Sequence, residues 1–469
     1  MDFRLLQDTI CAIATPIGEA GIGVIRISGP EARSLALTIF KPRRSDITLK
    51  SHMLHYGWIK DPHSGETIDE VLLSFMEAPK TYTREDVVEI NCHSGYAVLN
   101  RILELVIAAG ARLAEPGEFT RRAFLNGRLD LSQVEAVIEI IRSRSEQGLL
   151  LANRHLRGDF REVIEKWRAA LLQAQTQIEA YIDFSEDLPE ETEEEAPAYE
   201  SIMEELRGEV MEPLNSALAK YEEGRVLREG LTLVLVGKPN VGKSSMLNAL
   251  LGKDRAIVTA APGTTRDVIE DSFLLSGVQV RILDTAGIRN RPDEIETHGI
   301  ERTIRSVSEA DVVLWLLDNS RPLTSEDQKV YEAVSGSRYI VLLNKSDLPP
   351  AFPIERVQER FSGPAPVFRL SVKNPSDIER LKTYMAETFV MRPLESCRSE
   401  IVPNMRQKEC LEKSRSALSR AEELIRSGAY GELISMELQS ARRQIEAVLG
   451  WENDGDLLDA IFARFCIGK

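Results

Sequence analysis

The sequence predicts a multidomain α/β protein: a doubly wound α/β domain inserted into a discontinuous helical domain and preceded by an α+β domain. The length of 469 residues corresponds to roughly three domains of about 150 residues each. From residue 231 to residue 390, apolar strand-like runs alternate with helical segments, which is typical of βαβ units. Helical periodicity without strands lies on both sides of that stretch, so we expect the two helical blocks to pack together.

The amino-terminal stretch, residues 1–118, mixes strand-like and helical segments. The strand-like runs are GVIRIS from Gly23, EVLLSFM from Glu70 and DVVEINCH from Asp86, and helices are expected over residues 31–40 and 96–109. This mixture predicts a compact α+β domain.

The two helical blocks are expected over residues 119–226 and 391–469. In the first block, Ser132 and Glu135 match the capping box that begins a helix. Apolar residues recur at helical spacing in both blocks, and nothing in either block indicates that it folds as a separate domain. The segment between them, residues 227–390, is therefore predicted to be an insertion, with strands LTLVLVG, VQVRILD, VVLWLLD, YIVLLNK and PVFRLSV.

Composition excludes several classes of protein. The net charge is −16, from 58 Lys+Arg and 74 Asp+Glu, so the chain as a whole repels phosphate backbones and anionic lipids. A nucleic-acid site would need a local basic patch such as Arg121-Arg122 or Arg442-Arg443, although such pairs are more often solvated helix faces. The five cysteines contain no CxxC pair, which argues against a disulfide framework and a zinc site. The longest strongly apolar run, 312–317, is too short to span a membrane, so a cytoplasmic protein without membrane contact is expected.

A phosphate-binding loop follows the first strand of the α/β segment. Residues 237–244, GKPNVGKS, match the pattern Gly-x-x-x-x-Gly-Lys-Ser/Thr between a strand and a helix. In such a loop, backbone N–H groups surround the phosphates. Lys243 is expected to reach the β and γ oxygens, and the Ser244 hydroxyl to ligate Mg²⁺. The segment is thus predicted to bind a nucleoside triphosphate.

Further segments follow in the order that a GTPase requires. The segment GTTRD, with Thr264 and Thr265, offers a hydroxyl to Mg²⁺ and the γ-phosphate, and DTAG from Asp284 to Gly287 is placed to bind the metal's water shell and sense that phosphate. In NKSD, the Asp347 carboxylate can accept hydrogen bonds from two guanine donors that adenine lacks. The segment SVK from Ser371 occupies the place of the fifth guanine-loop motif. Together these segments predict a P-loop, Ras-like GTPase domain that binds GTP.

The usual hydrolysis machinery is incomplete. A Ras-type GTPase carries a water-orienting glutamine just after its DxxG motif, but here that residue is Ile288. The domain could be a slow switch, or a carboxylate of the nearby acidic stretch 293–296 could replace the glutamine. On spacing alone, we favour a solvated loop for that stretch.

The motifs together resemble one family. The GKPNVGKSS loop, GTTRD, DTAGIR and NKSD, the amino-terminal GIGVIRISG and PGEFTRRAFLNGRLDLSQVEA, and the terminal FCIGK are similar to the MnmE (TrmE) family of tRNA-modification GTPases. The resemblance spans essentially the whole chain. PGEFTRRAF and the terminal CIGK are not general GTPase features, and they separate this family from the ribosome-assembly GTPases.

The resemblance implies a reaction and partners. Members are homodimers joined through the amino-terminal domain. With the flavoprotein MnmG, in an expected heterotetramer, they add an aminomethyl or carboxymethylaminomethyl group to C5 of the wobble uridine of certain tRNAs. The amino-terminal domain binds a formyl-tetrahydrofolate, and the matching contacts here are Arg26, Glu89, Arg128 and Lys469.

The resemblance also implies that K⁺-dependent pairing of two nucleotide domains activates hydrolysis. The K⁺ ligands would come from Asn240, Thr259, Ala261 and Thr264, the Mg²⁺ ligands from Ser244 and Thr265, and the catalytic carboxylate from Glu296, against the solvated-loop interpretation above. The implied nucleotide contacts are Asn240, Val241, Gly242, Lys243, Ser244, Ser245, Thr259, Thr264, Thr265, Asp284, Thr285, Ala286, Gly287, Asn344, Lys345 and Asp347.

Two interpretations of Cys466 stay open. From residue type alone, a buried small apolar residue beside Phe465 is favoured. In the context of FCIGK, a catalytic role near the folate pocket is equally well supported. For the whole chain, a ribosome-assembly GTPase would need an RNA-binding domain such as a KH domain, a membrane-remodelling GTPase would need a lipid-binding segment, and a signalling switch leaves FCIGK unexplained.

Overall fold

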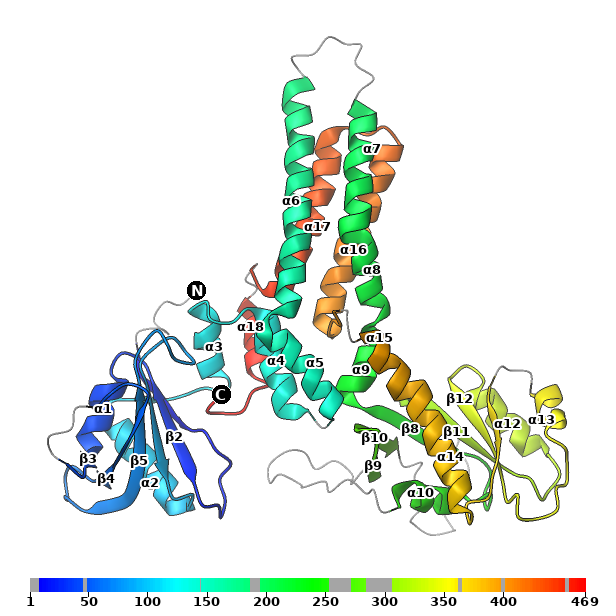
Figure 1. Ribbon diagram of the computed structural model, residues 1–469, viewed down its shortest axis with the longest axis horizontal. Helices are drawn as coiled ribbons and strands as arrows, with labels where there is room; N and C mark the ends of the chain where they lie inside the picture. Colours follow the sequence, from blue (N-terminus) through cyan, green and yellow to red (C-terminus); the bar gives the residue numbers. More distant parts are fainter. Residues whose placement is uncertain are drawn as a thin grey trace. The chain divides into compact units, whose positions relative to one another are not determined.

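The computed structural model describes residues 8–44, 49–143, 145–185, 195–252, 271–283, 306–361, 365–397, 401–451 and 455–469. The chain forms two compact units, which are described in turn (Figure 1). The first unit comprises Met1–Ile138, Arg154–Val210 and Lys413–Lys469, and the second comprises Glu139–Asn153 and Met211–Glu412.

A seven-stranded sheet forms the amino-terminal part of the first unit, in the order β3-β4-β5-β6-β2-β1-β7. Its strands are β1 (Ile10–Ile13), β2 (Gly23–Ser28), β3 (Phe40–Pro42), β4 (Met53–Lys60), β5 (Thr67–Met76), β6 (Val87–Cys92) and β7 (Arg112–Leu113). Neighbouring strands are antiparallel except β1 and β7. The three predicted strands are confirmed as β2, β5 and β6.

Each face of this sheet has its own apolar cluster. Inward-facing residues such as Ile25 and Leu73 pack with α1 (Ala32–Ile39) and α2 (Tyr96–Ala108), which confirms the two predicted helices. On the other face, Phe119 of α3 (Glu118–Leu125) packs against Ile10 and Ala12 of β1. The chain therefore holds α3 against the face that is opposite to α1 and α2.

The helical part of the first unit brings together two distant stretches of chain. Helix α6 (Asp159–Ser185) lies beside α17 (Gly431–Leu449), as Figure 1 shows. Arg168 Nε donates to Glu446 Oε1 at 2.7 Å, and Ser435 Oγ donates to Glu179 Oε1 at 3.0 Å. These contacts confirm the predicted discontinuous helical domain.

The helix boundaries correct one prediction. Helix α4 (Leu131–Arg142) is capped by Asp130, because Gln133 N donates to Asp130 Oδ1 and Asp130 N donates to Gln133 Oε1, each at 3.0 Å. The predicted box of Ser132 and Glu135 is therefore wrong by two residues. Ser132 lies inside the helix, and its hydroxyl donates to the same Asp130 oxygen at 2.5 Å.

The second unit contains a six-stranded sheet in the order β13-β12-β11-β8-β10-β9, parallel except for β9. Its strands are β8 (Leu231–Val236), β9 (Asp271–Leu275), β10 (Val278–Leu283), β11 (Val312–Asp318), β12 (Tyr339–Asn344) and β13 (Val367–Arg369). One apolar cluster includes Leu233 and Leu314, and another includes Val234 and Trp315. Because alternate residues of one strand enter different clusters, both faces are covered, as a doubly wound sheet requires. All five predicted strands are confirmed.

The remaining helices are α5 (Glu146–Arg157), α7 (Glu195–Leu206), α8 (Glu212–Ala219), α9 (Tyr221–Glu229), α10 (Lys243–Leu251), α12 (Ser325–Val334), α13 (Glu355–Arg360), α14 (Pro375–Ala386), α15 (Arg392–Cys397), α16 (Met405–Arg426) and α18 (Gly455–Phe462), with π-helical turns η2 (Arg207–Met211) and η3 (Glu387–Met391). None of the helices that the structure describes has both the length and the apolar composition needed to cross a bilayer. The predicted domain limits at residues 118, 226 and 390 stay predictions.

Candidate functional site

The phosphate loop, residues 237–244, joins the fully buried strand β8 to α10. Gly237 has φ +146° and Gly242 has φ +106°. A Cβ atom would lie 2.5 Å from the Leu316 carbonyl oxygen at the first position and 2.3 Å from Asn344 Nδ2 at the second. Both positions therefore need glycine, which leaves the backbone N–H groups of the loop accessible to a phosphate.

Lys243 supplies a cation at this loop. Its ammonium donates to the carbonyl oxygens of Gly237 at 2.6 Å and Lys238 at 2.8 Å. Burial lowers the pKa of Lys243. Within the described parts of the chain, no carboxylate pairs with this ammonium, so its charge is available to phosphate oxygens. Ser244 and Ser245 are exposed on the first turn of α10.

The segment that follows β12 contacts the phosphate loop directly. Asn344 Nδ2 donates to the Val241 carbonyl oxygen at 2.7 Å, and Asn344 Oδ1 accepts from Val372 N at 3.2 Å. Lys345 Nζ donates to the Asn240 carbonyl oxygen at 3.0 Å and to Asp318 Oδ2 at 2.7 Å. Asn344 and Lys345 thus bind the phosphate loop to the segments expected to hold the base. Asp318, at the end of β11, was not anticipated from the sequence.

Asp347 lies beside the segment that begins at Ser371. One of its carboxylate oxygens accepts from Ser371 Oγ at 2.8 Å, and the other pairs with Lys373 Nζ at 3.0 Å. The hydrogen bond from Ser371, followed by that from Lys373, lowers the pKa of Asp347. Asp347 is therefore held as a carboxylate acceptor.

Sequence reasoning missed a second anchor of the phosphate loop. Lys238 Nζ donates to Asp327 Oδ2 at 2.7 Å and to Thr324 Oγ1 at 2.9 Å. Thr324 and Asp327 form the capping box of α12, and Asp327 is 2% exposed. The pattern Thr-x-x-Asp before α12 was a readable signal for the cap, but its contact with Lys238 crosses 89 residues.

Several predicted nucleotide and metal contacts lie outside the described residues. They are Thr259, Ala261, Thr264, Thr265, Asp284, Thr285, Ala286, Gly287 and Glu296. Ile288 and the acidic stretch 293–296 fall there too. The structure thus brings together the phosphate loop and the guanine segments, and the roles assigned to the other residues stay predictions.

A second cluster of predicted residues lies on the first unit's sheet. Arg26 of β2 stands opposite Glu89 of β6, and its Nε donates to Glu89 Oε1 at 2.8 Å. The Arg26 guanidinium carbon lies 5.7 Å from the centre of the Phe119 ring of α3. We use the name Arg26–Glu89 pocket for this group of residues, Arg26, Glu89 and Phe119, together with the carboxyl-terminal residues that contact it.

The carboxyl terminus of the chain reaches this pocket. Arg26 Nη1 donates to the Gly468 carbonyl oxygen at 2.9 Å, a contact across 442 residues. Gly468 has φ +94°, and a Cβ atom there would lie 2.6 Å from the Ile13 carbonyl oxygen. Burial, followed by the nearby Arg26 charge, lowers the pKa of Lys469. The predicted Arg26, Glu89 and Lys469 are thus neighbours.

The two remaining residues predicted for the folate site are Cys466 and Arg128. Cys466 is exposed, so the interpretation of it as a buried packing residue is wrong; the neighbour, Phe465, is buried instead. Gly117 N donates to the Cys466 carbonyl oxygen at 3.4 Å. Arg128 lies over the Tyr82 ring at 4.7 Å and donates to the Tyr82 carbonyl oxygen at 3.1 Å.

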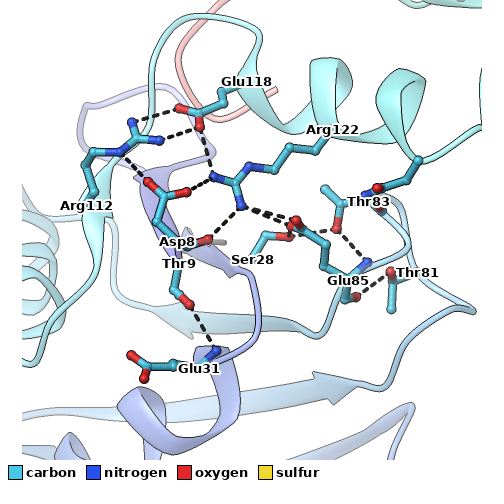
Figure 2. Close-up of polar contacts among 11 residues, drawn as sticks. Asp8, Thr9, Ser28, Glu31, Thr81, Thr83, Glu85, Arg112, Glu118 and Arg122 are labelled. Carbon is cyan, nitrogen blue, oxygen red and sulfur yellow. Dashed lines mark hydrogen bonds and ion pairs between the residues drawn. The ribbon is translucent and has the colours of Figure 1, made fainter. Parts of the chain in front are cut away.

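An ion-pair cluster joins α3 to residues of other segments of the first unit, as Figure 2 shows. Arg122 pairs with Asp8 at 2.5 Å, Glu118 at 3.0 Å and Glu85 at 3.2 Å. Its side chain is 2% exposed. The interpretation of Arg121-Arg122 as a tRNA contact or a solvated helix face is therefore wrong for Arg122, because its charge is buried against carboxylates.

Burial and ion pairing oppose each other in this cluster. Burial alone would raise the pKa of Asp8, but hydrogen bonds from Arg112 and Arg122 outweigh it and the pKa falls. For Glu85 the burial effect prevails over Arg122, and the pKa rises. Arg442, of the other basic pair, is engaged by Glu446 at 2.7 Å.

The fold and the first site define a class of protein. A glycine-rich phosphate loop after β8, bound to an Asn-Lys-x-Asp segment after β12 at the carboxyl ends of parallel strands, is the arrangement of a P-loop GTPase domain. Here that domain is inserted into a helical domain and preceded by an α+β sheet domain.

Comparisons identify the family. A model described as "GTP-binding protein TrmE N-terminus" matches residues 9–128, and one described as "MnmE helical domain" matches residues 131–466. A tRNA modification GTPase MnmE of Syntrophobacter fumaroxidans is 58% identical over 469 residues, with 100% of both chains covered. That of Carboxydothermus hydrogenoformans is 44% identical, over 99% of this chain and 100% of its own. The chain belongs to the MnmE family of tRNA modification GTPases.

Solved structures give more distant matches. An Aquifex aeolicus Era variant bound to GDP and AlF₄⁻ is 24% identical and covers 40% of this chain and 66% of its own, with a TM-score of 0.28.

Proposed function

We propose that the protein hydrolyses GTP and, together with the flavoprotein MnmG, adds an aminomethyl or carboxymethylaminomethyl group to C5 of the wobble uridine of certain tRNAs in the cytoplasm. The observation that carries the GTPase part is the set of contacts joining Asn344, Lys345 and Asp347 to the phosphate loop and to Ser371. Membership of the MnmE family supports tRNA as the substrate.

Asp347 would select guanine. Its carboxylate can accept from the N1–H and the 2-amino group, two donors that adenine does not present together. Adenine would leave this acceptor without the two donors, which disfavours adenine relative to guanine. The lowered pKa of Asp347 supports this role, since only the ionised carboxylate accepts both hydrogen bonds.

The loop residues fit a Mg²⁺-bound triphosphate. Lys243 would hold β and γ oxygens, and backbone N–H groups beside Gly242 would bind the remaining phosphate oxygens. The exposed Ser244 hydroxyl would ligate Mg²⁺ together with Thr265. The metal supplies charge neutralisation between the phosphates.

The residues proposed for activation are partly outside the described chain. Asn240 is exposed on the phosphate loop with φ +64°, and its carbonyl oxygen is held by Lys345. With Thr259, Ala261 and Thr264 it would hold K⁺, which supplies positive charge at the phosphates in place of an arginine finger. Glu296 would orient the attacking water, because the apolar Ile288 cannot.

The Arg26–Glu89 pocket would bind the formyl-tetrahydrofolate. Arg26, Glu89 and the terminal Lys469 place two cations and one carboxylate close together beside the Phe119 ring. A folate carries a polar pterin and anionic glutamyl carboxylates, which such groups can bind. Arg128 would contribute from beside Tyr82, and the exposed Cys466 would act as a catalytic residue there.

A second copy of the chain would cover an apolar patch on the same sheet face. Leu54, Tyr56 and Trp58 of β4 and Leu72 of β5 share that face, and we call them the outer-face patch. Leu54 is 61% exposed and Leu72 is 43% exposed. In the β-sheet register, Leu54 stands opposite Ser74, and Ser74 stands opposite Glu89, so the patch borders the Arg26–Glu89 pocket.

Two experiments test the proposal, one on tRNA from cells and one on GTP hydrolysis by the full-length protein. In a strain lacking the gene, we expect the wobble uridine to lose its C5 substituent and to regain it on complementation, as measured by nucleoside mass spectrometry. In vitro, GTP turnover should be faster in K⁺ than in Na⁺, and Asn240→Ala should weaken that difference. Unchanged tRNA in the deletion strain would refute the tRNA function, and equal turnover in both salts would refute the K⁺ site.

A further inference from the structure

We propose that Arg122 is a positioning residue for the Arg26–Glu89 pocket: its buried ion pairs hold α3 in the register in which that helix supports Arg26 and fixes the carboxyl-terminal tail. The proposal deepens the one-carbon function proposed above and rests on it for the identity of the ligand. It gives a role to the PGEFTRRAF segment, which the proposed reaction does not otherwise use.

Three residues of this segment contact Arg26 or the carboxyl-terminal part of the chain. Gly117 N donates to the Cys466 carbonyl oxygen at 3.4 Å, and a Cβ at Gly117 would lie 2.7 Å from the Phe462 carbonyl oxygen. Phe119 is fully buried and lies under the Arg26 guanidinium. Arg121 pairs with Asp459 of α18 at 3.0 Å. A shift of α3 would therefore move both the support of Arg26 and the tail.

Arg122 determines where α3 sits on the sheet. Besides its three carboxylates, its Nη1 donates to the Asp8 carbonyl oxygen at 2.8 Å, just before β1 (Figure 2). Glu85 is in turn bound by Ser28 Oγ at 2.7 Å. Ser28 follows Arg26 by two residues on β2, so both side chains emerge on the same sheet face. Through Glu85 and Ser28, the cluster is thus hydrogen-bonded to the strand that carries Arg26.

The charges explain why this anchor needs arginine. Asp8, Glu85 and Glu118 bring three negative charges, and Arg112 and Arg122 bring two positive charges. A planar guanidinium can donate to several carboxylates in fixed directions, whereas an ammonium cannot reproduce that fork. Methionine at this position would remove the cation and leave buried carboxylates underpaired.

The test uses the full-length chain with Arg122→Met and Arg122→Lys. Arg101→Met is the control, because in the part of the unit that the structure describes the ion pairs of Arg101 are with Asp61 and Glu104 and not with a residue of α3. Thermal melting checks that each variant folds. Hydrogen exchange, followed by mass spectrometry, reports on the peptides around Gly117 and from residue 463 to residue 469, and calorimetry measures binding of formyl-tetrahydrofolate.

In Arg122→Met we expect exchange in both peptides to quicken and the affinity for the folate to fall, each about tenfold, the scale of one lost charged hydrogen bond. Arg122→Lys should give exchange rates and a folate affinity between those of the wild type and Arg122→Met. Arg101→Met should match the wild type in both. GTP turnover should not change, because the G domain contains none of these residues. Weaker folate binding without a change in GTP hydrolysis separates a positioning role from a general folding defect.

Wild-type exchange in a folded Arg122→Met variant would overturn the proposal. If that variant does not fold, Arg122→Lys decides in the same way: wild-type protection of the tail overturns the proposal, and lost protection supports it. If the wild type binds no folate but the tail still loosens in the variants, the positioning role stands and the ligand assignment fails.

Discussion

The Asp347 carboxylate is bound at both oxygens, by Ser371 and by Lys373. These partners fix the direction in which its remaining lone pairs point, so in the proposed role the residue would discriminate between bases by geometry as well as by charge. The residue also stays ionised at lower pH than an ordinary aspartate.

Asp347→Asn should change the base preference. An amide presents a donor where the carboxylate accepted, which suits the carbonyl that xanthine has in place of guanine's 2-amino group. We expect GTP affinity to fall at least about a hundredfold, since two hydrogen bonds to a charged group are lost. Xanthosine triphosphate turnover should rise, as steady-state kinetics with both nucleotides would measure. Retained GTP preference would contradict the assignment.

Glu296→Ala tests the water-orienting role. Since Ile288 has no polar group, another residue must orient water, and losing a positioned acid or base typically lowers kcat by about a hundredfold or more. GTP affinity should change little, which binding of a fluorescent analogue would show. Near-wild-type turnover would mean that Glu296 belongs to a solvated loop. Glu296→Gln keeps the size of the side chain and removes its charge, so it separates the role of the carboxylate from that of side-chain packing.

Cys466→Ser separates the two sites. The thiol is exposed and lies within three residues of Lys469, whose main-chain N–H donates to the Cys466 carbonyl oxygen at 3.4 Å. We expect K⁺-stimulated GTP hydrolysis to persist and most of the modified wobble uridine to disappear in a complementation assay. Normal modification would show that the thiol is dispensable. Cys410→Ser, at a half-buried cysteine of α16, serves as the control.

At the scale of elements, the phosphate loop and α12 are tied together. Asp327 accepts from Thr324 N, from Thr324 Oγ1 and from Lys238, all through one nearly buried oxygen. A single carboxylate oxygen thus caps the helix and holds the loop. This link accounts for a lysine at the second position of the loop, which the phosphate-binding pattern leaves free.

Lys238→Met should destabilise the second unit. Among the described residues, Lys238 is the cation that pairs with the buried Asp327, and an unpaired buried charge costs about 3–5 kcal/mol. We expect the melting temperature of the corresponding transition to fall by several degrees. Lys238→Met combined with Asp327→Asn should recover part of the loss. An additive double variant in calorimetry would show that the two side chains are not coupled.

The sequence predicts some elements better than others for identifiable reasons. Strands β8, β11 and β12 of the α/β segment are fully buried and mostly apolar, so they stand out from their surroundings in the sequence. By contrast, β4 reads MLHYGWIK, where a histidine and a glycine occupy buried positions. The sequence therefore shows no clear alternation of apolar and polar residues there, and the strand is not predicted from it. Near α4 the run DLSQVE contains two overlapping cap patterns, Asp130 with Gln133 and Ser132 with Glu135, and only hydrogen bonding decides between them.

Local motifs and long-range contacts also differ in how readable they are. The residues from Gly237 to Ser244 lie in one segment whose spacing reflects one ligand, so the site is visible in the sequence. The contact of Arg26 with Gly468 joins the two ends of the chain, and the Arg122 cluster joins residues from three segments. Neither follows from periodicity, because each depends on how the helical block folds back on the sheet.

At the scale of the whole molecule, the acidic net charge restricts how tRNA can bind. The charge is −16, and arginines that looked available in the sequence are engaged: Arg122 by three carboxylates and Arg442 by Glu446. Arginines that are engaged in ion pairs within the fold are thus not free to neutralise phosphates. A tRNA surface must draw on other cations or on the proposed flavoprotein partner.

The outer-face patch provides a test of the proposed homodimer. Leu54→Asp together with Leu72→Asp places two charges on an apolar sheet face that a second copy would bury, and burying an unpaired charge is strongly unfavourable. Each leucine also loses its apolar burial on association, which is worth less than the roughly 1.5–3 kcal/mol of full burial because both side chains are already partly buried in the single chain. We expect sedimentation velocity to show a shift from dimer to monomer over a micromolar concentration series.

The matched control replaces two leucines of similar exposure elsewhere in the first unit. Leu172 of α6 is 41% exposed and Leu433 of α17 is 45% exposed, so Leu172→Asp with Leu433→Asp adds the same charge without touching the sheet. This control should stay dimeric. If K⁺ activation depends on pairing two nucleotide domains, monomers must find each other by collision, and GTP turnover per chain in the patch variant should rise with protein concentration. Turnover independent of concentration, in a variant that is still dimeric, would place the interface on another surface.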